Sequence, residues 1–228
     1  MKPLSKLHQE SIIKAKTDQE KIKAAATAMI ETPMNERTAR VARTTKETVV
    51  EVSVNLDGTG RADVSTGIGF FDHMLTALAK HARFDLELRC KGDLEVDDHH
   101  TTEDCALALG QAVDAALGDR RGIERFGHAY APLDEALARV VVDLSGRPWP
   151  KVNLGLKRER IGEMSCECID HVFRSLAINL RASLHVDVLE GDNDHHRAEA
   201  AFKACAIALR RAVSRSGSSE VPSTKGVL

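Results

Sequence analysis

Two kinds of hydrophobic pattern alternate along the chain, and each predicts one kind of element. Alternation with a period of two predicts a strand, as at 48–56, where Val50, Val52 and Val54 share one face. Runs rich in Ala and Leu predict helices, as at 99–117, which ends before Gly118. By these criteria we expect strands at 48–56, 61–65, 84–89, 138–144, 151–156 and 184–188. Helices are expected at 70–81, 99–117, 170–180 and 195–213.

The second half of the chain repeats the order of the first. A shift of 98 residues places Asp72-His73 on Asp170-His171. After a slightly shorter turn, His99-His100-x-x-Glu103 matches His195-His196-x-x-Glu199. This predicts an α+β fold with an internally duplicated β-β-α-β-α unit and helices on one face of a mostly antiparallel sheet. The first two strands of each unit are expected to run out and back across a turn.

The repeats are assigned to 37–121 and 122–228, with a boundary in the region 122–134. Residues 1–36 form an N-terminal extension that is predicted to be flexible or helical. This extension is rich in Lys and Ala but also contains acidic residues, which is unlike an organelle transit peptide.

Composition narrows the class of protein. Hydrophobic residues make up 43% and charged residues 29% of the chain, which is typical of a folded globular protein. The net charge of −2 argues against a nucleic-acid partner, and no apolar run approaches the ~20 residues that span a bilayer. Five cysteines without a C-x-x-C pair indicate a reducing compartment. The prediction is therefore a cytoplasmic location, with plastid import as the alternative.

Histidine is the chemically informative residue type, because six of the ten histidines fall into the two matching patterns. Neighbouring residues on a helix point about 100° apart, so His99 and His100 serve different sites. Glu103 shares a face with either of them. Three imidazoles and one carboxylate for each of two ions would suit Mn, Fe, Zn or Co. The candidate ligands are His73, His99, His100, Glu103, His171, His195, His196 and Glu199.

A single pattern of this kind is more often a helix cap or a solvated surface, and it is the duplication that favours metal binding. Several acidic residues near the histidines are candidates to orient the imidazoles: Asp72, Asp97, Asp98, Asp104 and Asp170. For Asp97 and Asp98, capping of the helix N-terminus is an equally good explanation. Basic residues near polar turns can bind an anion such as phosphate, although each alone is more often a solvated charge: Arg125, Arg147, Arg197, Lys203 and Lys225.

Several separated segments resemble the signature segments of the imidazoleglycerol-phosphate dehydratase family. They are Phe70-Phe71-Asp72-His73-Met74, Asp97-Asp98-His99-His100-Thr101-Thr102-Glu103-Asp104, Ser145-Gly146-Arg147-Pro148, Asp194-His195-His196-Arg197-Ala198-Glu199-Ala200 and Pro222-Ser223-Thr224-Lys225-Gly226-Val227-Leu228. The resemblance covers residues 37–228 and implies a carbon–oxygen lyase of histidine biosynthesis with two Mn²⁺ ions per active site. It also implies a homo-oligomer of about 24 chains built from trimers.

The resemblance assigns roles residue by residue. One ion would be held by His73, His100, Glu103 and His196, and the other by His99, His171, His195 and Glu199. Catalytic roles would fall to Glu47, His73 and His171. The C-terminal segment of the second repeat would bind substrate. The full set of expected substrate contacts is Glu47, His73, His99, Arg125, Arg147, His195, Arg197, Lys203, Ser223, Thr224 and Lys225.

The implied reaction converts imidazole glycerol phosphate to imidazole acetol phosphate. No carbonyl acidifies the C–H bond of this diol, so a metal-bound imidazolate would supply the electrons that expel the hydroxyl. Glu47 is the candidate for handling the hydroxyl or the proton, and a metal-bound water is its rival. Two other functions use the same ligands: a dinuclear hydrolase of phosphate esters, which would release inorganic phosphate, and a non-catalytic metal-binding shell protein.

Overall fold

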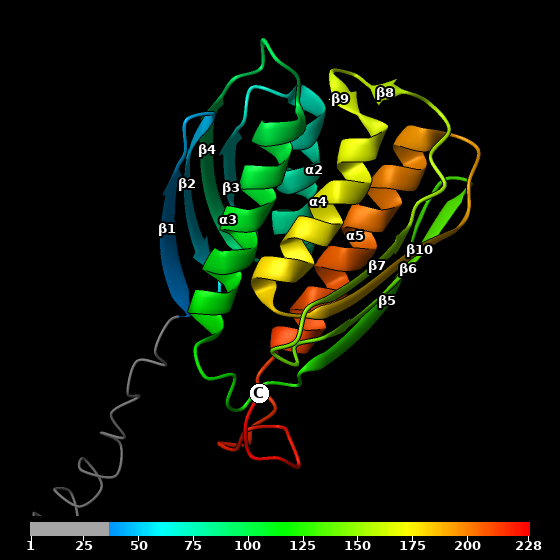
Figure 1. Ribbon diagram of the computed structural model, residues 1–228. Helices are drawn as coiled ribbons and strands as arrows, with labels where there is room; N and C mark the ends of the chain where they lie inside the picture. The colour runs from blue at the N-terminus through cyan, green and yellow to red at the C-terminus, as the bar shows by residue number, and fades with distance from the viewer. Residues whose placement is uncertain (1–36) are drawn as a thin grey trace, which may run out of the picture. The chain divides into compact units, whose positions relative to one another are not determined.

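The computed structural model describes residues 37–228, so the predicted extension 1–36 lies outside the described residues. Two four-stranded sheets enclose four helices (Figure 1). The first half contains β1 (Thr38–Thr44), β2 (Thr48–Asn55), β3 (Ala62–Ser65), α2 (Gly69–Ala82), β4 (Asp85–Gly92) and α3 (His99–Leu117). The second half contains β5 (Phe126–Leu133), β6 (Ala136–Asp143), β7 (Trp149–Asn153), β8 (Arg160–Ile161), β9 (Met164–Ser165), α4 (Cys166–Leu180), β10 (Ser183–Glu190) and α5 (Asp194–Val213).

The two sheets have equivalent strand orders, β1-β2-β4-β3 and β5-β6-β10-β7. Each sheet contains two antiparallel pairs and one parallel pair. Helices α2 and α3 pack on the first sheet and α4 and α5 on the second, so the four helices form one layer between the sheets (Figure 1). The predicted α+β class, with helices on one face of each mostly antiparallel sheet, is confirmed.

Each four-stranded sheet has one more strand than the sequence pattern predicted, so the repeating unit is β-β-β-α-β-α. The additional sheet strands are β1 and β5, and the second half also contains the short pair β8-β9, which was not predicted. The strand β5 was missed because its inward-facing residues are Gly127, Ala129 and Ala131, which give almost no hydrophobic alternation. Their small size has a structural cause, since a Cβ at Gly127 would lie 2.0 Å from the carbonyl oxygen of Ala208 on α5.

The expectation that the first two predicted strands of each unit pair with one another is wrong. Strand β3 pairs in parallel with β4, and β7 pairs in parallel with β10. Parallel neighbours require a crossover, which α2 provides between β3 and β4. The antiparallel partners of β2 and β6 are instead the additional strands β1 and β5.

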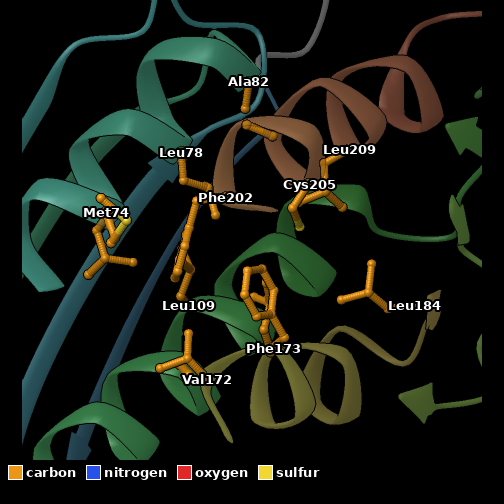
Figure 2. Close-up of a cluster of buried hydrophobic side chains, with 14 of the residues drawn as sticks. Met74, Leu78, Ala82, Leu109, Val172, Phe173, Leu184, Phe202, Cys205 and Leu209 are labelled. Carbon is orange, nitrogen blue, oxygen red and sulfur yellow. The ribbon is translucent and has the colours of Figure 1, made fainter. Parts of the chain in front are cut away.

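Small side chains in the helical layer let the helices approach closely. A Cβ at Gly110 on α3 would lie 2.7 Å from the carbonyl oxygen of Leu176 on α4. The buried rings of Phe173 on α4 and Phe202 on α5 are in contact, with centroids 4.6 Å apart (Figure 2). Within the layer, α2 packs against α5 and α3 packs against α4. Within residues 37–228, none of the helices combines the length and apolar character needed to cross a bilayer.

The carboxylate of Asp85 fixes the conformation of the loop between β2 and β3. Asp85 Oδ1 accepts hydrogen bonds from the backbone N–H groups of Thr59, Gly60 and Arg61, and its Oδ2 accepts from the Arg61 guanidinium. The Arg61 hydrogen bond outweighs burial and lowers the pKa of Asp85. We expect Asp85→Asn to reduce the free energy of unfolding at pH 7 by about 1–3 kcal/mol.

The difference in the free energy of unfolding between wild type and Asp85→Asn should decrease in acid. A folded-state pKa below the unfolded value of about 3.9 stabilises the protein above that pH, and the effect is lost as the pH falls through the folded pKa. Denaturant unfolding of metal-free wild type and Asp85→Asn should therefore show a gap that is full at pH 7 and narrows below about pH 4. A gap that widens in acid would contradict this role for Asp85.

Candidate metal centres

Helices α3 and α5 begin at equivalent histidine pairs. Asp97 Oδ1 accepts a hydrogen bond from the His99 backbone N–H, and Asn193 Oδ1 accepts one from that of His195. The ring centroids within each pair, His99–His100 and His195–His196, are 6.1 Å apart, and the ring planes make an angle of 85°. The duplicated geometry confirms that neighbouring histidines face different directions.

The first three-residue group lies between α2 and α5, and we call it the α2–α5 cluster. It consists of His73, His195 and Glu199. The Nε2 atoms of both histidines lie 3.2 Å from Glu199 Oε2, and Lys203 Nζ lies 2.8 Å from Glu199 Oε1. Burial raises the pKa of Glu199, but hydrogen bonds from Lys203 and His73 outweigh it and lower that pKa to about 2. At neutral pH the cluster therefore presents an ionised carboxylate between two imidazoles.

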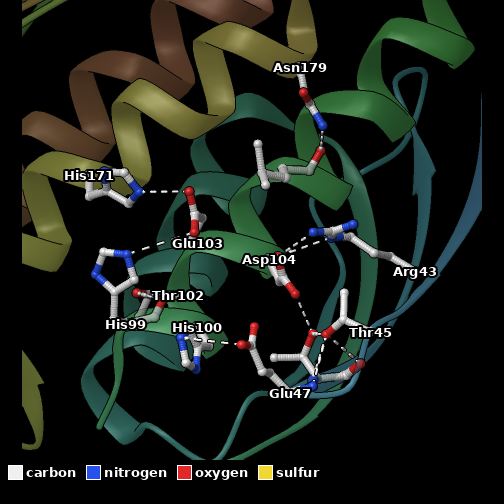
Figure 3. Close-up of polar contacts among 12 residues, drawn as sticks. Arg43, Thr45, Glu47, His99, His100, Thr102, Glu103, Asp104, His171 and Asn179 are labelled. Carbon is white, nitrogen blue, oxygen red and sulfur yellow. Dashed lines mark hydrogen bonds and ion pairs between the residues drawn. The ribbon is translucent and has the colours of Figure 1, made fainter.

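The second group lies between α3 and α4, and we call it the α3–α4 cluster. It consists of His99, Glu103 and His171. His171 Nε2 lies 3.0 Å from Glu103 Oε1, and His99 Nε2 lies 3.8 Å from Glu103 Oε2 (Figure 3). The rings of His99 and His171 stack with centroids 4.9 Å apart.

The helix pairing explains why the ligands group in this way. Because α2 packs on α5 and α3 packs on α4, each cluster in a single chain combines one repeat with the other. This grouping differs from the division that the resemblance implied, since His73 is beside Glu199 and not beside Glu103. Six of the eight candidate ligands are brought together. His100 and His196 belong to neither cluster in the described part of the chain.

The two remaining histidines each contact a carboxylate through Nδ1. His100 Nδ1 lies 3.0 Å and 3.2 Å from the two oxygens of Asp93, and His196 Nδ1 lies 2.7 Å from Glu135 Oε2. These hydrogen bonds raise the pKa of both imidazoles, and the His196 contact lowers the pKa of Glu135 to about 2. The Nε2 atoms are thus the ring nitrogens left to face a ligand.

Asp93 and Glu135 were not among the acidic residues expected to orient the imidazoles. The residues that were expected have other partners. Asp72 accepts from Thr66, Asp98 accepts from Ser165, and Asp104 accepts from Arg43 and Thr48 (Figure 3). Asp97 caps α3, which was the alternative explanation for it, and Asp170 pairs with Arg174. The short spacing of seven residues between Asp93 and His100, across the turn between β4 and α3, was a usable signal for the first pair only.

Of the remaining predicted residues, some lie near the histidines and others lie near the C-terminal segment. Glu47, whose side chain is 52% exposed, has its Oε1 3.8 Å from His100 Nε2 (Figure 3). Lys203 contacts the α2–α5 cluster, as described above. Arg125 is held by both oxygens of Asp143 and donates to the carbonyl of Pro222. The C-terminal Leu228 approaches the turn that contains Arg147, because a Cβ at Gly146 would lie 2.8 Å from Leu228 C.

Arg197 is placed differently from the other basic residues. Its guanidinium donates to the backbone carbonyls of Leu154 and Gly191, with distances of 2.6–3.0 Å. The side chain therefore anchors two loops beside the start of α5, and its expected contact with substrate remains a prediction.

The donor types in the two clusters fit a divalent transition ion. Imidazole nitrogen with carboxylate oxygen suits Mn, Fe, Zn or Co better than Ca or Mg. Each cluster offers three donor atoms within 4.8 Å of one another, which leaves room for a further ligand and for substrate. The fold and these clusters define a class: an α+β protein with two candidate transition-metal centres on one layer of helices.

Comparisons with known proteins identify the family. The family model of imidazoleglycerol-phosphate dehydratase matches residues 66–209. The chain is 63% identical over 192 residues to the imidazoleglycerol-phosphate dehydratase of Phytophthora nicotianae, covering 84% of this chain but only 42% of that longer protein. It is 53% identical over 216 residues to that of Kluyveromyces lactis, covering 85% of this chain and 98% of the relative.

Solved structures agree with the sequence comparison. The imidazoleglycerol-phosphate dehydratase of Staphylococcus aureus superposes with a TM-score of 0.71 at 37% identity, covering 78% of this chain and 99% of that one. The chain belongs to the imidazoleglycerol-phosphate dehydratase family, as its motifs suggested. It is accordingly a hydro-lyase of histidine biosynthesis.

Proposed function

We propose that this protein binds two Mn²⁺ ions per active site and dehydrates imidazole glycerol phosphate to imidazole acetol phosphate. The observation that carries the proposal is the pair of three-residue clusters, each with two imidazoles and one carboxylate, together with the partly exposed imidazoles of His100 and His196. One further imidazole for each cluster completes two sites of three histidines and one glutamate. When bound, the two ions would act as Lewis acids that stabilise negative charge developing on the substrate.

The chain's own residues position the substrate and move its protons. Glu47 lies beside His100 and is half exposed, so its carboxylate can accept a proton and, once protonated, donate it to the departing hydroxyl. His73 and His171 face the carboxylates of the two clusters, where they would border the bound ring. Lys203 keeps Glu199 ionised through its 2.8 Å contact.

Three of the basic residues proposed to bind the phosphate, Arg125, Arg147 and Lys225, lie far from the clusters of the same chain. His195 is in the first turn of α5, whereas the Arg125 backbone N–H donates to Ala212 in the last turn. A helix of 20 residues is about 30 Å long. The clusters therefore lie at one end of the helical layer and the C-terminal segment at the other (Figure 1). A small phosphate ester cannot contact both in one chain.

This separation supports an active site formed between copies of the chain. We propose a homo-oligomer of about 24 chains built from trimers, in which one copy supplies the phosphate-binding residues and a neighbour supplies the metal ligands. His100 and His196 expose side-chain fractions of 33% and 28%, so they are accessible to a neighbouring copy.

Metal content and product identity together test the proposed function. Elemental analysis of active protein should find two transition ions per chain, with Mn²⁺ giving the highest activity. Consumption of imidazole glycerol phosphate should yield a ketone with no release of inorganic phosphate. Release of phosphate would favour the dinuclear hydrolase, and one ion or none in an active preparation would exclude the two-metal site.

The phosphate assignment predicts a selective defect. Arg147→Lys keeps the positive charge but loses the planar guanidinium that binds two phosphate oxygens at once. We expect KM to rise by about tenfold, which is about 1.4 kcal/mol of binding free energy, while the metal content stays unchanged. Steady-state kinetics with elemental analysis checks this. Loss of Mn²⁺ with an unchanged KM would show that Arg147 serves the metal centre instead.

We also propose a reducing compartment, the cytoplasm, as the site of action. All five cysteines of the chain are free thiols in the structure, and four of them are buried. Burial raises the pKa of Cys205 to about 12, which makes this thiol unreactive.

A further inference from the structure

The two histidines outside the clusters share a feature that the other ligands lack. Each has a carboxylate on Nδ1: Asp93 for His100, at 3.0 Å and 3.2 Å, and Glu135 for His196, at 2.7 Å. Hydrogen bonding at one ring nitrogen determines which tautomer a neutral imidazole adopts. An ionised carboxylate can only accept, so the proton lies on Nδ1 and the lone pair on Nε2.

The two carboxylates come from different parts of the two repeats. Asp93 precedes His100 by seven residues, in the turn between β4 and α3. The residue seven positions before His196 is Leu189, which is exposed and has no polar atom in its side chain, and the residue that directly follows β10, as Asp93 follows β4, is Gly191. Glu135 instead lies in the turn between β5 and β6, 61 residues before His196.

The position that matches Glu135 in the first repeat is Glu47. Both residues directly precede a strand, β6 and β2, and these strands have closely similar burial patterns. Both carboxylate oxygens of Glu135 accept hydrogen bonds, because Oε2 contacts His196 and Oε1 accepts from the backbone N–H groups of Asp192 and Asn193, at 3.1 Å and 2.8 Å. Glu47 makes only a 3.8 Å approach to His100, whose Nδ1 is already held by Asp93. The two glutamates thus differ in availability, although they stand at equivalent positions.

We propose that Asp93 and Glu135 are positioning residues that fix His100 and His196 with Nε2 as the metal-binding nitrogen. Asp93 also leaves Glu47 free for proton transfer, whereas its counterpart Glu135 is committed to orienting a ligand. This inference rests on the proposed two-metal function and adds to it the residues that set ligand tautomer and direction. Carboxylates in this position typically strengthen metal binding by about 10–100-fold.

The most informative variant is Glu135→Gln. Its amide oxygen can keep the contacts with Asp192 and Asn193, and its NH₂ group then faces His196 Nδ1 as a donor. That arrangement favours the tautomer with the proton on Nε2, and a protonated Nε2 has no lone pair with which to bind a metal ion. Asp93→Asn is the milder change, because both Asp93 oxygens lie within reach of His100 and an amide oxygen can still accept.

The experiment measures Mn²⁺ binding to metal-free protein by isothermal titration calorimetry. We expect Glu135→Gln to raise the Kd of one of the two sites by about 10–100-fold and to leave the other unchanged. Asp93→Asn should weaken the other site by a smaller factor. Glu135→Asp, which retains the carboxylate, should recover part of the affinity. The control is Glu51→Gln, an exposed glutamate on β2 paired with Arg40, which should leave both sites unchanged.

The outcomes separate this inference from the proposed function. If wild type binds no divalent ion, the two-metal proposal fails. If wild type binds two ions and both Glu135→Gln and Asp93→Asn bind them with unchanged Kd, the proposed function stands and the positioning roles are wrong. If Glu135→Gln does not fold, as judged by circular dichroism, Asp93→Asn decides the matter through the Kd of the His100 site.

Discussion

Replacing His195 with alanine is expected to lower kcat/KM by about 10³-fold. Loss of one imidazole from the α2–α5 cluster leaves Glu199 and His73 to hold the ion, and a Lewis acid contributes several kcal/mol to the transition state. Each 1.36 kcal/mol corresponds to a factor of ten in rate. His99→Ala in the α3–α4 cluster should have a similar effect, because both ions act on the same ring. Elemental analysis of each variant should show that close to one ion per chain is lost.

A matched control separates ligand loss from general damage. His185 lies on β10, outside both clusters, and His185→Ala should retain full metal content and activity. The assignment fails if His195→Ala keeps both ions and a kcat/KM within tenfold of wild type. It also fails if His185→Ala is equally inactive.

Removing the metal should disassemble the particle and abolish activity together. The proposed ligands His100 and His196 belong to neither cluster of their own chain, so in the proposed oligomer binding of the ions would join neighbouring copies. Binding that occurs only in the assembled state stabilises that state, by about 2.7 kcal/mol for each site at a ligand concentration 100 times Kd. A chelator should therefore shift the large particle toward trimers, and added Mn²⁺ should restore both size and turnover.

Light scattering combined with an activity assay checks this linkage. Particle mass and turnover should follow the same dependence on Mn²⁺ concentration. A fully active monomer would contradict the proposed site between copies. A particle whose mass is unaffected by chelator and Mn²⁺ would show that assembly does not depend on the metal.

The sequence predicts those features that depend on local pattern or on duplication. The predicted helix 99–117 coincides with α3, because Ala and Leu fill its buried face and Gly118 follows its end. The doubled His-His-x-x-Glu pattern and the matching upstream histidines, His73 and His171, include the six residues that the fold brings into two clusters. These features are encoded within a few residues of one another.

Features that depend on packing between distant elements could not be predicted. Strand β5 shows little hydrophobic alternation, because α5 packs against glycine and alanine there. The pairing of His73 with Glu199 depends on α2 lying beside α5. The contact between Glu135 and His196 joins residues 61 positions apart. The duplication does not predict this contact, since the equivalent residue in the first repeat, Glu47, lies 3.8 Å from Nε2 of His100, whose Nδ1 contacts Asp93.

The most direct test of the central claim is the conversion of imidazole glycerol phosphate by metal-free and Mn²⁺-reconstituted protein. Metal-free protein is expected to form no imidazole acetol phosphate. Activity is expected to rise with added Mn²⁺ until two ions are bound per chain. Ketone formation at the full rate by protein shown to contain no transition metal would contradict the proposed two-metal function.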